Sequence, residues 1–441
     1  MLSDSRSFSP NPGGKGAVRG YRRQGKYAKF SKHHKAQHHS LADEVWFLGG
    51  EAPGLHSRSG CRSRGCYGGV GFSLHFRGPP AGKAAPRGLP KGYLLASRPW
   101  PEHNRMILYD PRQLHSLMDF GIEIPVLDSR ASETFARLSS HPHLAARREA
   151  WHINALRGPV DREDLLRVHS ADYVSRLFSA GLEAEIIRTY ELIDANGNYY
   201  RYQPALATRP LSELFDRILI RAGGTLQCCR RALESGFCFY FGGGMHHAQK
   251  DYGAGFCLVN DLVTALRRLQ AETRIRRAWV IDVDAHKGDG TAALAAGDDS
   301  IATLSIHMAA GWPLDQPERG AGGRPNPSFI PSTVDIPIAA GEEPVYNRRL
   351  REGLERMAGA GRPDLALVVC GADPYELDEL PSAAGLRLSL EQLLERDQLV
   401  YSFLKARGIP GAWVMAGGYG RNSWRVYTQF LEWALLERLG G

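Results

Sequence analysis

One short strand near the middle of the chain constrains the fold more than any other segment. It runs from Trp279 toward His286, and three polar residues, Asp282, Asp284 and His286, occupy alternate positions at its end. Alternate side chains of a strand point to the same side, so these three would converge at the carboxyl end of the strand. Open α/β sheets bind their ligands at that edge. Because an unpaired buried charge is very unfavourable, each of the three residues needs a partner there.

The sequence from residue 106 onward predicts further buried strands, separated by helices. Short runs rich in Val, Ile and Phe predict strands at 106–109, 237–241, 278–283, 301–306, 334–338, 365–370 and 412–416. Amphipathic stretches predict helices at 162–168, 171–180, 211–235, 261–273, 346–358, 390–405 and 424–438. Strands that alternate with helices form parallel βαβ units. We therefore expect an α/β fold, in which a doubly wound, mainly parallel sheet is flanked by helices, within one domain of residues 106–441.

The first 105 residues have a different composition. They carry 18 Lys and Arg against 5 Asp and Glu, a net charge of +13, which leaves −5 for residues 106–441 out of the total of +8. Gly, Pro, Ser, Arg and His recur there without apolar periodicity, and such a segment buries too little surface to offset the entropy of ordering. We expect a disordered basic extension, or an over-extended gene start upstream of Met106. Nucleic-acid binding is expected only as non-specific attraction to this extension.

Cysteine usage and hydropathy argue against two classes of protein. The seven Cys are odd in number and irregularly spaced, which argues against a disulfide framework. Cys61 and Cys66, near His56, fall short of the four closely paired ligands of a structural zinc site. No run approaches ~18 apolar residues, and the N-terminus lacks the apolar segment of a signal peptide. A cytoplasmic protein that does not enter membranes is therefore expected.

Three further strand ends carry residues suited to chemistry. His246 and His247 follow the strand at 237–241, Asp373 follows 365–370, and Tyr419 follows 412–416. Each has an ordinary explanation on its own, since a lone Asp after a strand is more often a helix N-cap and Gly-Gly-Tyr is usually a turn. If the strands form one parallel sheet, however, these residues would lie at the same edge as Asp282, Asp284 and His286. One His and two carboxylates leave an open coordination position on a hydrolytic Zn²⁺, and Fe²⁺ or Co²⁺ suit the same donors.

Taken together, these motifs resemble the histone deacetylase family of the arginase/deacetylase superfamily, and their spacing is most similar to its bacterial and class IV-like members. The resemblance spans about residues 106–435 and rests on the segments 164–174, 242–248, 255–261, 282–290, 305–307, 371–373 and 417–419. Several linked motifs in the same order are far more specific than any one of them. The resemblance implies a hydrolase that removes an acetyl or related acyl group from an amine. Its substrate would be an acyl-lysine in a protein or peptide, or an acylated small amine.

The resemblance also implies a role for each candidate residue. The metal would be held by Asp284, His286 and Asp373. The tandem histidines would act in catalysis, with Asp282 orienting His246 and Asp289 orienting His247. Tyr419 would donate a hydrogen bond to the substrate carbonyl.

Two further sets of residues are implied in the same way. Phe256 and Gly255 would line a narrow channel for the acyl-lysine stem. A monovalent cation, usually K⁺, would be surrounded by oxygens of Asp282, Asp284, His286 and Ser305, several of them backbone carbonyls.

The chain departs from the family pattern at the rim of this channel. Many members carry a Phe-Pro-Gly loop after the Ser-x-His strand, whereas this chain offers Trp312 as the replacement for the second channel aromatic. The segment after Asp373 also lacks the Gly that usually precedes the next Asp. Substrate preference therefore stays open between a protein lysine, an acetylpolyamine and another small amide. A non-catalytic module that binds acyl-lysine would be expected to lack a metal ligand, a His or the Tyr, and none is missing.

Overall fold

A computed structural model describes residues 105–113, 116–194, 196–320 and 323–440. Eight parallel strands form one sheet in the order β2-β1-β3-β8-β7-β4-β5-β6. The strands are β1 (Ile107–Leu108), β2 (His152–Ile153), β3 (Phe237–Tyr240), β4 (Ala278–Asp282), β5 (Ile301–Met308), β6 (Val334–Ile338), β7 (Leu365–Cys370) and β8 (Gly411–Met415). The predicted α/β class and parallel sheet are confirmed.

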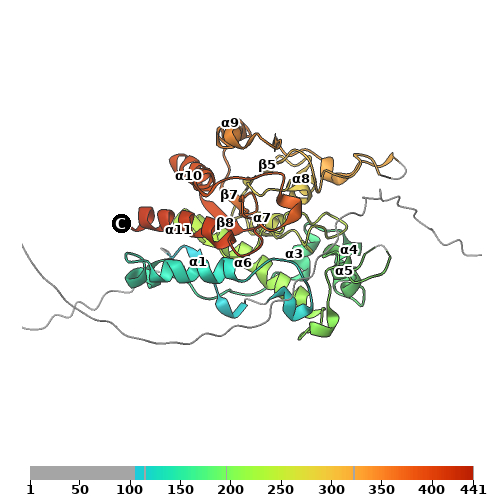
Figure 1. Ribbon diagram of the computed structural model, residues 1–441. Helices are drawn as coiled ribbons and strands as arrows, with labels where there is room; N and C mark the ends of the chain where they lie inside the picture. The colour runs from blue at the N-terminus through green and yellow to red at the C-terminus, as the bar shows by residue number, and fades with distance from the viewer. Residues whose placement is uncertain (1–104, 114–115, 195, 321–322, 441) are drawn as a thin grey trace, which may run out of the picture. The chain divides into compact units, whose positions relative to one another are not determined.

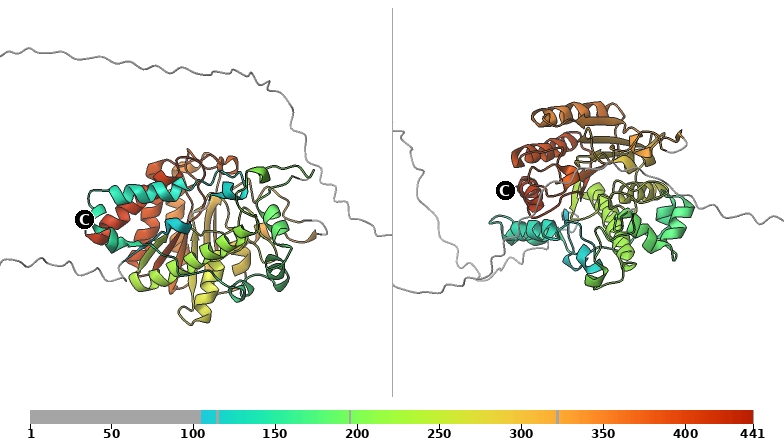
Figure 2. Two further views of the ribbon diagram at one scale, coloured as in Figure 1. Left: turned by 90° about the horizontal axis from the view of Figure 1, so that it is seen from below. Right: turned by 45° about the vertical axis from the view of Figure 1, so that its right-hand side comes forward.

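Helices cover both faces of the sheet (Figures 1 and 2). One face carries α1 (Ser129–Ser140), α9 (Tyr346–Ala358), α10 (Leu390–Ala406) and α11 (Ser423–Leu439). The other carries α6 (Glu213–Ser235) and α7 (Asp261–Ala271), with α8 (Asp289–Ala295) beside α7. The short helices α2 (Arg148–Trp151), α3 (Arg162–Leu166), α4 (Ala171–Leu177) and α5 (Leu182–Thr189) complete the set. Among the described residues, no helix is both long enough and apolar enough to cross a bilayer.

Alternation along the central strands builds a separate core on each face of the sheet. Trp279 and Ile281 of β4 pack into the cluster formed with α9, α10 and α11. Ala278 and Val280 of the same strand pack into the cluster formed with α6 and α7. A strand covered on both faces must be apolar at every position except where it leaves the core. Its polar residues therefore gather where the strand ends.

The order of the strands brings the predicted site residues together. The chain passes from β3 to β4, continues through β5 and β6, and then inserts β7 and β8 between β3 and β4. The four strands that precede the candidate residues are thus consecutive neighbours, in the order β3-β8-β7-β4. Because they are parallel, their carboxyl ends share one edge of the sheet. The topology alone places the loops with the two His, the Tyr and the three ligand candidates side by side.

The seven expected strands and seven expected helices are all present, with bounds shifted by a few residues at most. Four helices, α1, α2, α5 and α8, and the short edge strand β2 were not predicted. The last of these helices begins at Asp289, which the sequence placed in a loop. Residues 1–104 of the expected basic extension, the Cys61–Cys66 pair included, lie outside the described residues. The five described Cys are free thiols.

Candidate metal centre and active site

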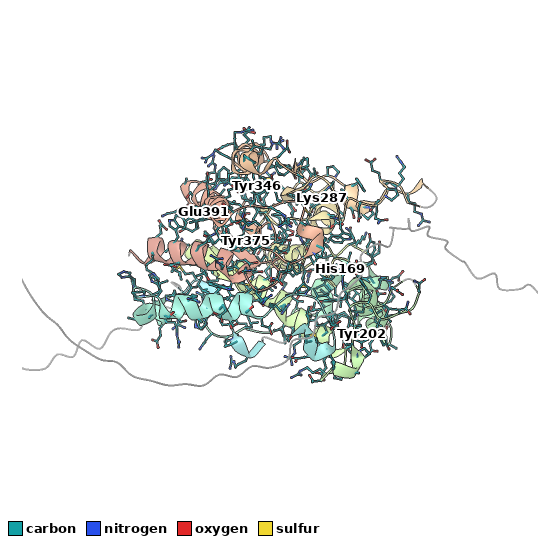
Figure 3. The ribbon with its side chains drawn as sticks, viewed as in Figure 1. His169, Tyr202, Lys287, Tyr346, Tyr375 and Glu391 are labelled. Atoms are coloured by element: carbon teal, nitrogen blue, oxygen red, sulfur yellow. The ribbon has the colours of Figure 1, made fainter. Side chains whose placement is uncertain are left out.

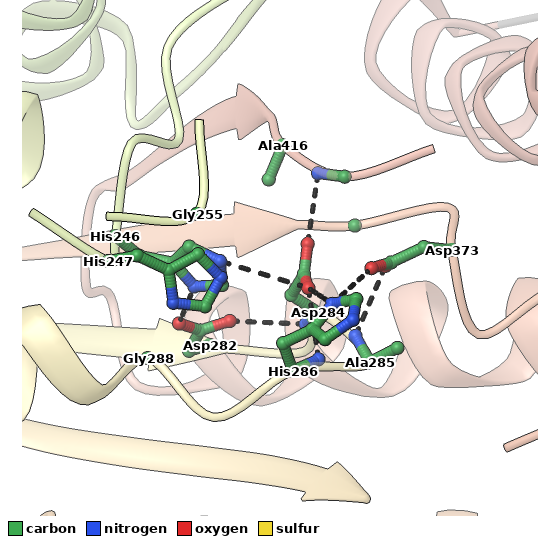
Figure 4. A network of polar contacts seen from close by, with 12 residues as sticks. His246, His247, Gly255, Asp282, Asp284, Ala285, His286, Gly288, Asp373 and Ala416 are labelled. Atoms are coloured by element: carbon green, nitrogen blue, oxygen red, sulfur yellow. Dashed lines mark hydrogen bonds and ion pairs between the residues drawn. The ribbon is translucent and has the colours of Figure 1, made fainter. Parts of the chain in front are cut away.

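Three buried side chains converge at the carboxyl edge of the sheet (Figure 4). One potential ligand atom from each of Asp284, His286 and Asp373 lies within 4.8 Å of the others. Nδ1 of His286 is 3.0 Å from Oδ2 of Asp373 and 3.2 Å from Oδ1 of Asp284. The first two residues follow β4, and the third follows its neighbour β7. The structure therefore brings together the three residues that the sequence singled out as metal ligands.

Backbone groups fix both carboxylates in place. The N–H of Gly417 donates to Oδ2 of Asp284 at 2.9 Å, and the N–H of Ala285 donates to Oδ1 of Asp373 at 3.1 Å. Gly417 and Gly371 both lie so close to Asp284 that a Cβ on either would collide with its Oδ2. Only glycine allows the backbone to approach the carboxylate this closely. The loops after β7 and β8 are thus shaped around this one acidic group.

The electrostatics of this cluster favour a bound cation. Burial lowers the pKa of His286, but hydrogen bonds and attraction from Asp284 and Asp373 outweigh burial and raise the pKa to about 10. Burial and then repulsion by Asp284 raise the pKa of Asp373 to about 6. Two buried carboxylates this close repel each other unless positive charge lies between them. Two carboxylate oxygens and one imidazole nitrogen also suit Zn²⁺, Fe²⁺ or Co²⁺, so the residues present fit a divalent metal.

The tandem histidines lie beside this cluster, and each is oriented by a carboxylate. Nδ1 of His246 is 2.6 Å from Oδ2 of Asp282, and Nδ1 of His247 is 2.8 Å from Oδ1 of Asp289. The two imidazole centroids are 3.8 Å apart. The pairing of each His with its Asp is the one that the sequence predicted. A carboxylate at Nδ1 fixes the tautomer and leaves Nε2 as the reactive nitrogen.

The two histidines differ in protonation. Burial lowers the pKa of His246, but the charges of Asp282 and Asp284 outweigh burial and raise the pKa to about 9. Burial and then the neighbouring His246 charge lower the pKa of His247 to about 4. At neutral pH one imidazole is therefore cationic and the other is neutral. A neutral imidazole can accept a proton, whereas its cationic neighbour stabilises developing negative charge.

Several supporting residues escaped the sequence analysis. Oδ2 of Asp289 accepts hydrogen bonds from Nε2 of Gln249 at 2.9 Å and from Oγ of Ser328 at 2.6 Å. Nε2 of His286 lies 3.3 Å from Oγ of Ser382, so an N–H there can donate and leave the Nδ1 lone pair for a metal. Gln249 lies two residues after His247, so its proximity to the His pair could have been inferred from the sequence. The two serines come from distant loops, and no local pattern marks them.

A fully buried arginine lies behind the metal-ligand cluster. Nη1 of Arg396 donates to the carbonyl oxygens of Val283 at 3.0 Å and Gly371 at 2.8 Å, and Nε donates to Asp397 at 2.8 Å. Both side chains of this pair are at most 1% exposed. The guanidinium therefore ties together the ends of β4 and β7, the two strands that present the ligands. The apolar pattern of 390–405 predicted a helix, but nothing in it indicated that Arg396 is buried. Charged residues on amphipathic helices usually face solvent.

A cavity of about 130 Å³ opens from the cluster toward solvent. Its walls include Gly255, Phe256 and Trp312, which were expected to line the channel, and Tyr419, which was expected to donate to the substrate carbonyl. The ring of Trp312 lies 4.4 Å from that of His247, and its role as the second channel aromatic stays a prediction. The ring of Phe256 lies 6.5 Å from that of Tyr419. Burial and then the charges of the nearby Asp residues raise the pKa of the Tyr well above its usual value, so its hydroxyl keeps its proton.

The resemblance implied a monovalent cation among oxygens of Asp282, Asp284, His286 and Ser305. Ser305 of β5 pairs with Asp282 of β4 in the sheet. Oγ of Ser305 lies 3.4 Å from the N–H of Gly288 and 3.0 Å from Nδ1 of His307. The oxygens of Asp284 and His286 follow in the same loop. A cation at this position stays a prediction.

Comparison with known proteins agrees with this geometry. Residues 125–432 match the family model of the histone deacetylase domain. The chain belongs to the histone deacetylase family. It is 31% identical over 263 residues to an uncharacterized protein of Picosynechococcus, a match that covers 59% of this chain and 77% of that protein.

Two further relatives carry functional names. Histone deacetylase 2 of Arabidopsis thaliana is 28% identical over 269 residues, which are 61% of this chain and 64% of the relative. The acetoin utilization protein AcuC of Staphylococcus aureus is 29% identical over 272 residues, which are 60% of this chain and 65% of the relative. The chain thus spans slightly less than two thirds of the length of each of these two relatives.

Proposed function

We propose that this chain is a metal-dependent amidohydrolase that removes an acyl group from an amine, with N-acetyl-lysine in proteins as the leading substrate. The single observation that carries the proposal is the position of the metal-ligand cluster. Asp284, His286 and Asp373 reach an aromatic cavity through His286, beside two histidines that are each oriented by an Asp. Membership of the histone deacetylase family supports the same reaction.

The proposed mechanism divides the work among this chain's own residues. A bound Zn²⁺, or Fe²⁺ or Co²⁺ on the same donors, would polarise the amide carbonyl and lower the pKa of water from ~16 toward ~7. The neutral His247 accepts the proton of the attacking water at Nε2 and later delivers it to the leaving amine. The cationic His246 stabilises the negative charge of the tetrahedral intermediate. The Tyr419 hydroxyl donates to the substrate oxygen, and such a donor contributes about 10²–10³ in rate.

The walls of the cavity explain how a lysine-like substrate would be held. Phe256 and Trp312 offer apolar surface to a methylene stem, while the narrow space excludes bulky groups. A second space of about 90 Å³ continues beyond the reacting centre, and Arg130 and Arg221 are among its lining residues. Positive charge on this side suits a released carboxylate. K⁺ at Asp282 and Ser305 would support the ligand loop from below.

Two other functions compete with this proposal. An acetylpolyamine or another small amide would use the same base of the cavity, and residues at its mouth would decide between the substrates. A non-catalytic module that binds acyl-lysine would need no intact acid–base pair, yet both His–Asp pairs are complete.

Metal analysis of the purified protein, combined with a panel of acetyl-lysine peptides and acetylated polyamines, tests the proposal. His247→Ala should retain metal and lose turnover, because this side chain handles protons and holds no ligand position. His143→Ala, which replaces an exposed histidine far from the cluster in sequence, serves as the matched control and should keep full activity. Turnover that survives in His247→Ala would contradict the mechanism. A metal-loaded wild-type protein that cleaves no acylated amine would contradict the proposed function itself.

A further inference from the structure

Two oppositely charged residues stand at the mouth of the aromatic cavity. Glu191 and Arg201 both line this cavity, and they are the Glu and the Arg among its described lining residues. Nη1 of Arg201 lies 2.6 Å from Oε2 of Glu191. We call these two residues the rim ion pair. Both reach the same cavity that contains His286 and Tyr419, so a molecule bound at the base could touch them with its outer end.

The backbone builds the rim ion pair across a tight fold-back of the chain. Glu191 has φ of 52° and occupies the left-handed position that ends α5, where Gly is the usual residue. The chain then returns through the antiparallel bridge between Ile193 and Tyr199. A side chain in this backbone region is unfavourable unless other interactions compensate, and such residues cluster at ligand sites. Gly would adopt the backbone conformation of residue 191 with less strain, but only a side chain at this position can direct a carboxylate toward the cavity.

The guanidinium of Arg201 lies close to two aromatic rings. Cζ of Arg201 lies 5.3 Å from the ring centroid of Phe256 and 4.8 Å from that of Tyr200. Phe256 is the same ring that forms a wall of the channel, so the base and the rim share one residue. No described residue hydrogen-bonds to Nε or Nη2 of Arg201, or to Oε1 of Glu191. Each partner of the rim ion pair therefore keeps hydrogen-bonding capacity for a ligand.

We propose that the rim ion pair binds the α-carboxylate and α-ammonium of a free amino acid, so that the substrate class is a zwitterionic Nε-acyl-lysine or close homologue. This rests on the proposed function for its chemistry, because the acyl amide must reach the metal-ligand cluster, but it puts the free amino acid in the place of the protein-borne acetyl-lysine as the leading substrate. Arg201 offers Nε and Nη2 as a planar fork that matches a carboxylate, and Glu191 offers Oε1 to the ammonium. The positive and negative charges stand side by side, as they do on the Cα of an amino acid.

The same charges disfavour the competing substrates. A lysine within a protein carries neither charge at its Cα and leaves both rim groups without an ionic partner. An acetylated polyamine satisfies Glu191 but brings its ammonium groups toward the Arg201 guanidinium. A site built for charged hydrogen bonds rejects an analogue that lacks them more strongly than an apolar site rejects a missing methylene. Only the zwitterion uses both halves of the rim ion pair.

A set of matched substrates tests the proposal by their kcat/KM values with the metal-loaded, full-length protein. Nε-acetyl-L-lysine should exceed Nε-acetyl-L-lysinamide, which lacks the carboxylate, and Nα-formyl-Nε-acetyl-L-lysine, which lacks the ammonium, each by about tenfold or more. N-acetylcadaverine and an acetyl-lysine within a capped peptide should fall below the zwitterion as well. A capped peptide that is cleaved as fast as the zwitterion overturns the inference while leaving the proposed function intact.

Variants assign each charge to its partner. In Arg201→Met, the kcat/KM of Nε-acetyl-L-lysine divided by that of Nε-acetyl-L-lysinamide should fall close to one. In Glu191→Gln, the kcat/KM of Nε-acetyl-L-lysine divided by that of Nα-formyl-Nε-acetyl-L-lysine should fall close to one. Ratios are used because any change in folding affects both substrates equally. Arg209→Met, which breaks the exposed pair of Arg209 with Glu213, is the control and should keep the wild-type ratios. If the ratios stay unchanged in Arg201→Met, the rim ion pair only stabilises its loop and does not bind the substrate.

Binding separates failure of this inference from failure of the proposed function. If no acylated amine is hydrolysed, the proposed function fails, and titration calorimetry with unreacted Nε-acetyl-L-lysine and Nε-acetyl-L-lysinamide still decides the role of the rim. A zwitterion that binds about tenfold more tightly than the amide supports the inference. Equal affinity overturns it.

Discussion

The base and the mouth of the cavity are built in opposite ways. At the base, Asp284, His286 and Asp373 are at most 4% exposed, and backbone N–H groups and glycines hold the carboxylates. At the mouth, the side chains of Glu191 and Arg201 are 49% and 25% exposed and hold each other. Charges interact far more strongly in a dry interior than near solvent. A lost contact should therefore be severe at the base and graded at the mouth.

The two regions also differ in which parts of the fold supply them. The base comes from the ends of four neighbouring strands of one sheet, so its geometry is fixed by the same packing that forms the core. The mouth comes from a loop that folds back after α5 and from the segment around Trp312. Chemistry is thus tied to the scaffold, while substrate choice lies in loops that can vary without disturbing it. Substitutions at the base should therefore change stability, metal binding and turnover, whereas substitutions at the mouth should change substrate choice.

The largest effect is expected from the buried arginine that ties the ligand strands together. Arg396→Met removes two hydrogen bonds to the ends of β4 and β7 and leaves the Asp397 charge buried without its partner. Breaking a buried ion pair from one side costs about 3–5 kcal/mol. We expect a loss of that size in the free energy of unfolding, measured by chemical denaturation, together with weaker metal binding by the folded fraction.

A double variant separates the two effects of this substitution. Arg396→Met with Asp397→Leu removes both charges, so much of the lost unfolding free energy should return. The tie between β4 and β7 is still missing in the double variant, and metal affinity should stay low. If metal affinity recovers along with stability, the arginine contributes only to folding, and the base is less dependent on this tie than proposed.

The sequence predicted the base far better than the mouth, for a physical reason. Asp284 and His286 are two residues apart on a strand, and period-2 alternation fixes their common direction before any tertiary structure is known. Asp373 and Tyr419 follow predicted strands of the same sheet, so parallel topology places them at the same edge. The histone deacetylase resemblance then supplied their roles. Local pattern and fold thus gave the same answer at the base.

The residues that were missed have no local signal. Ser328 and Arg396 act through contacts with residues 39 and 25 or more positions away in the chain, and neither sits in a motif. Glu191 and Arg201 lie in a stretch that the sequence analysis left without a predicted element. Their pairing depends on a left-handed residue and a chain reversal that hydrophobic periodicity does not reveal. Long-range polar contacts and loop geometry are the parts of the site that required the structure.

The next effect in size concerns the tyrosine that stands between the base and the mouth. Tyr419→Phe removes only the hydroxyl, while the backbone bonds of this residue to Asp378 and Ser423 remain. Loss of one donor to the developing oxyanion should lower kcat by about 10²–10³ with little change in KM. Steady-state kinetics on any accepted substrate measure this. Tyr199→Phe, at an exposed ring, is the control, and a kcat for Tyr419→Phe within a few-fold of wild type would remove this residue from the mechanism.

The smallest effect is expected from a histidine that supports the base from outside. His169 lies beside α3 (Figure 3), and both of its ring nitrogens are engaged. Nδ1 is 2.9 Å from the carbonyl oxygen of Gln249, and Nε2 accepts from the N–H of Asn260 at 3.1 Å. One nitrogen therefore donates and the other accepts, which requires a neutral ring. Burial lowers the pKa of this histidine to about 4.

This shift makes stability depend on pH in a defined window. Since the folded pKa of about 4 lies below the unfolded value of ~6.5, the unfolded chain binds more protons between these two values. The histidine's contribution is complete above pH ~6.5 and is lost as pH falls toward 4, by about 1–3 kcal/mol. His169→Gln should flatten the fall in unfolding free energy over this range, whereas the exposed control His143→Gln should not. If the unfolding free energies of wild type and His169→Gln fall with the same slope over this pH range, the surroundings of His169 tolerate a charged ring. The region next to the base would then be less dry than its burial indicates.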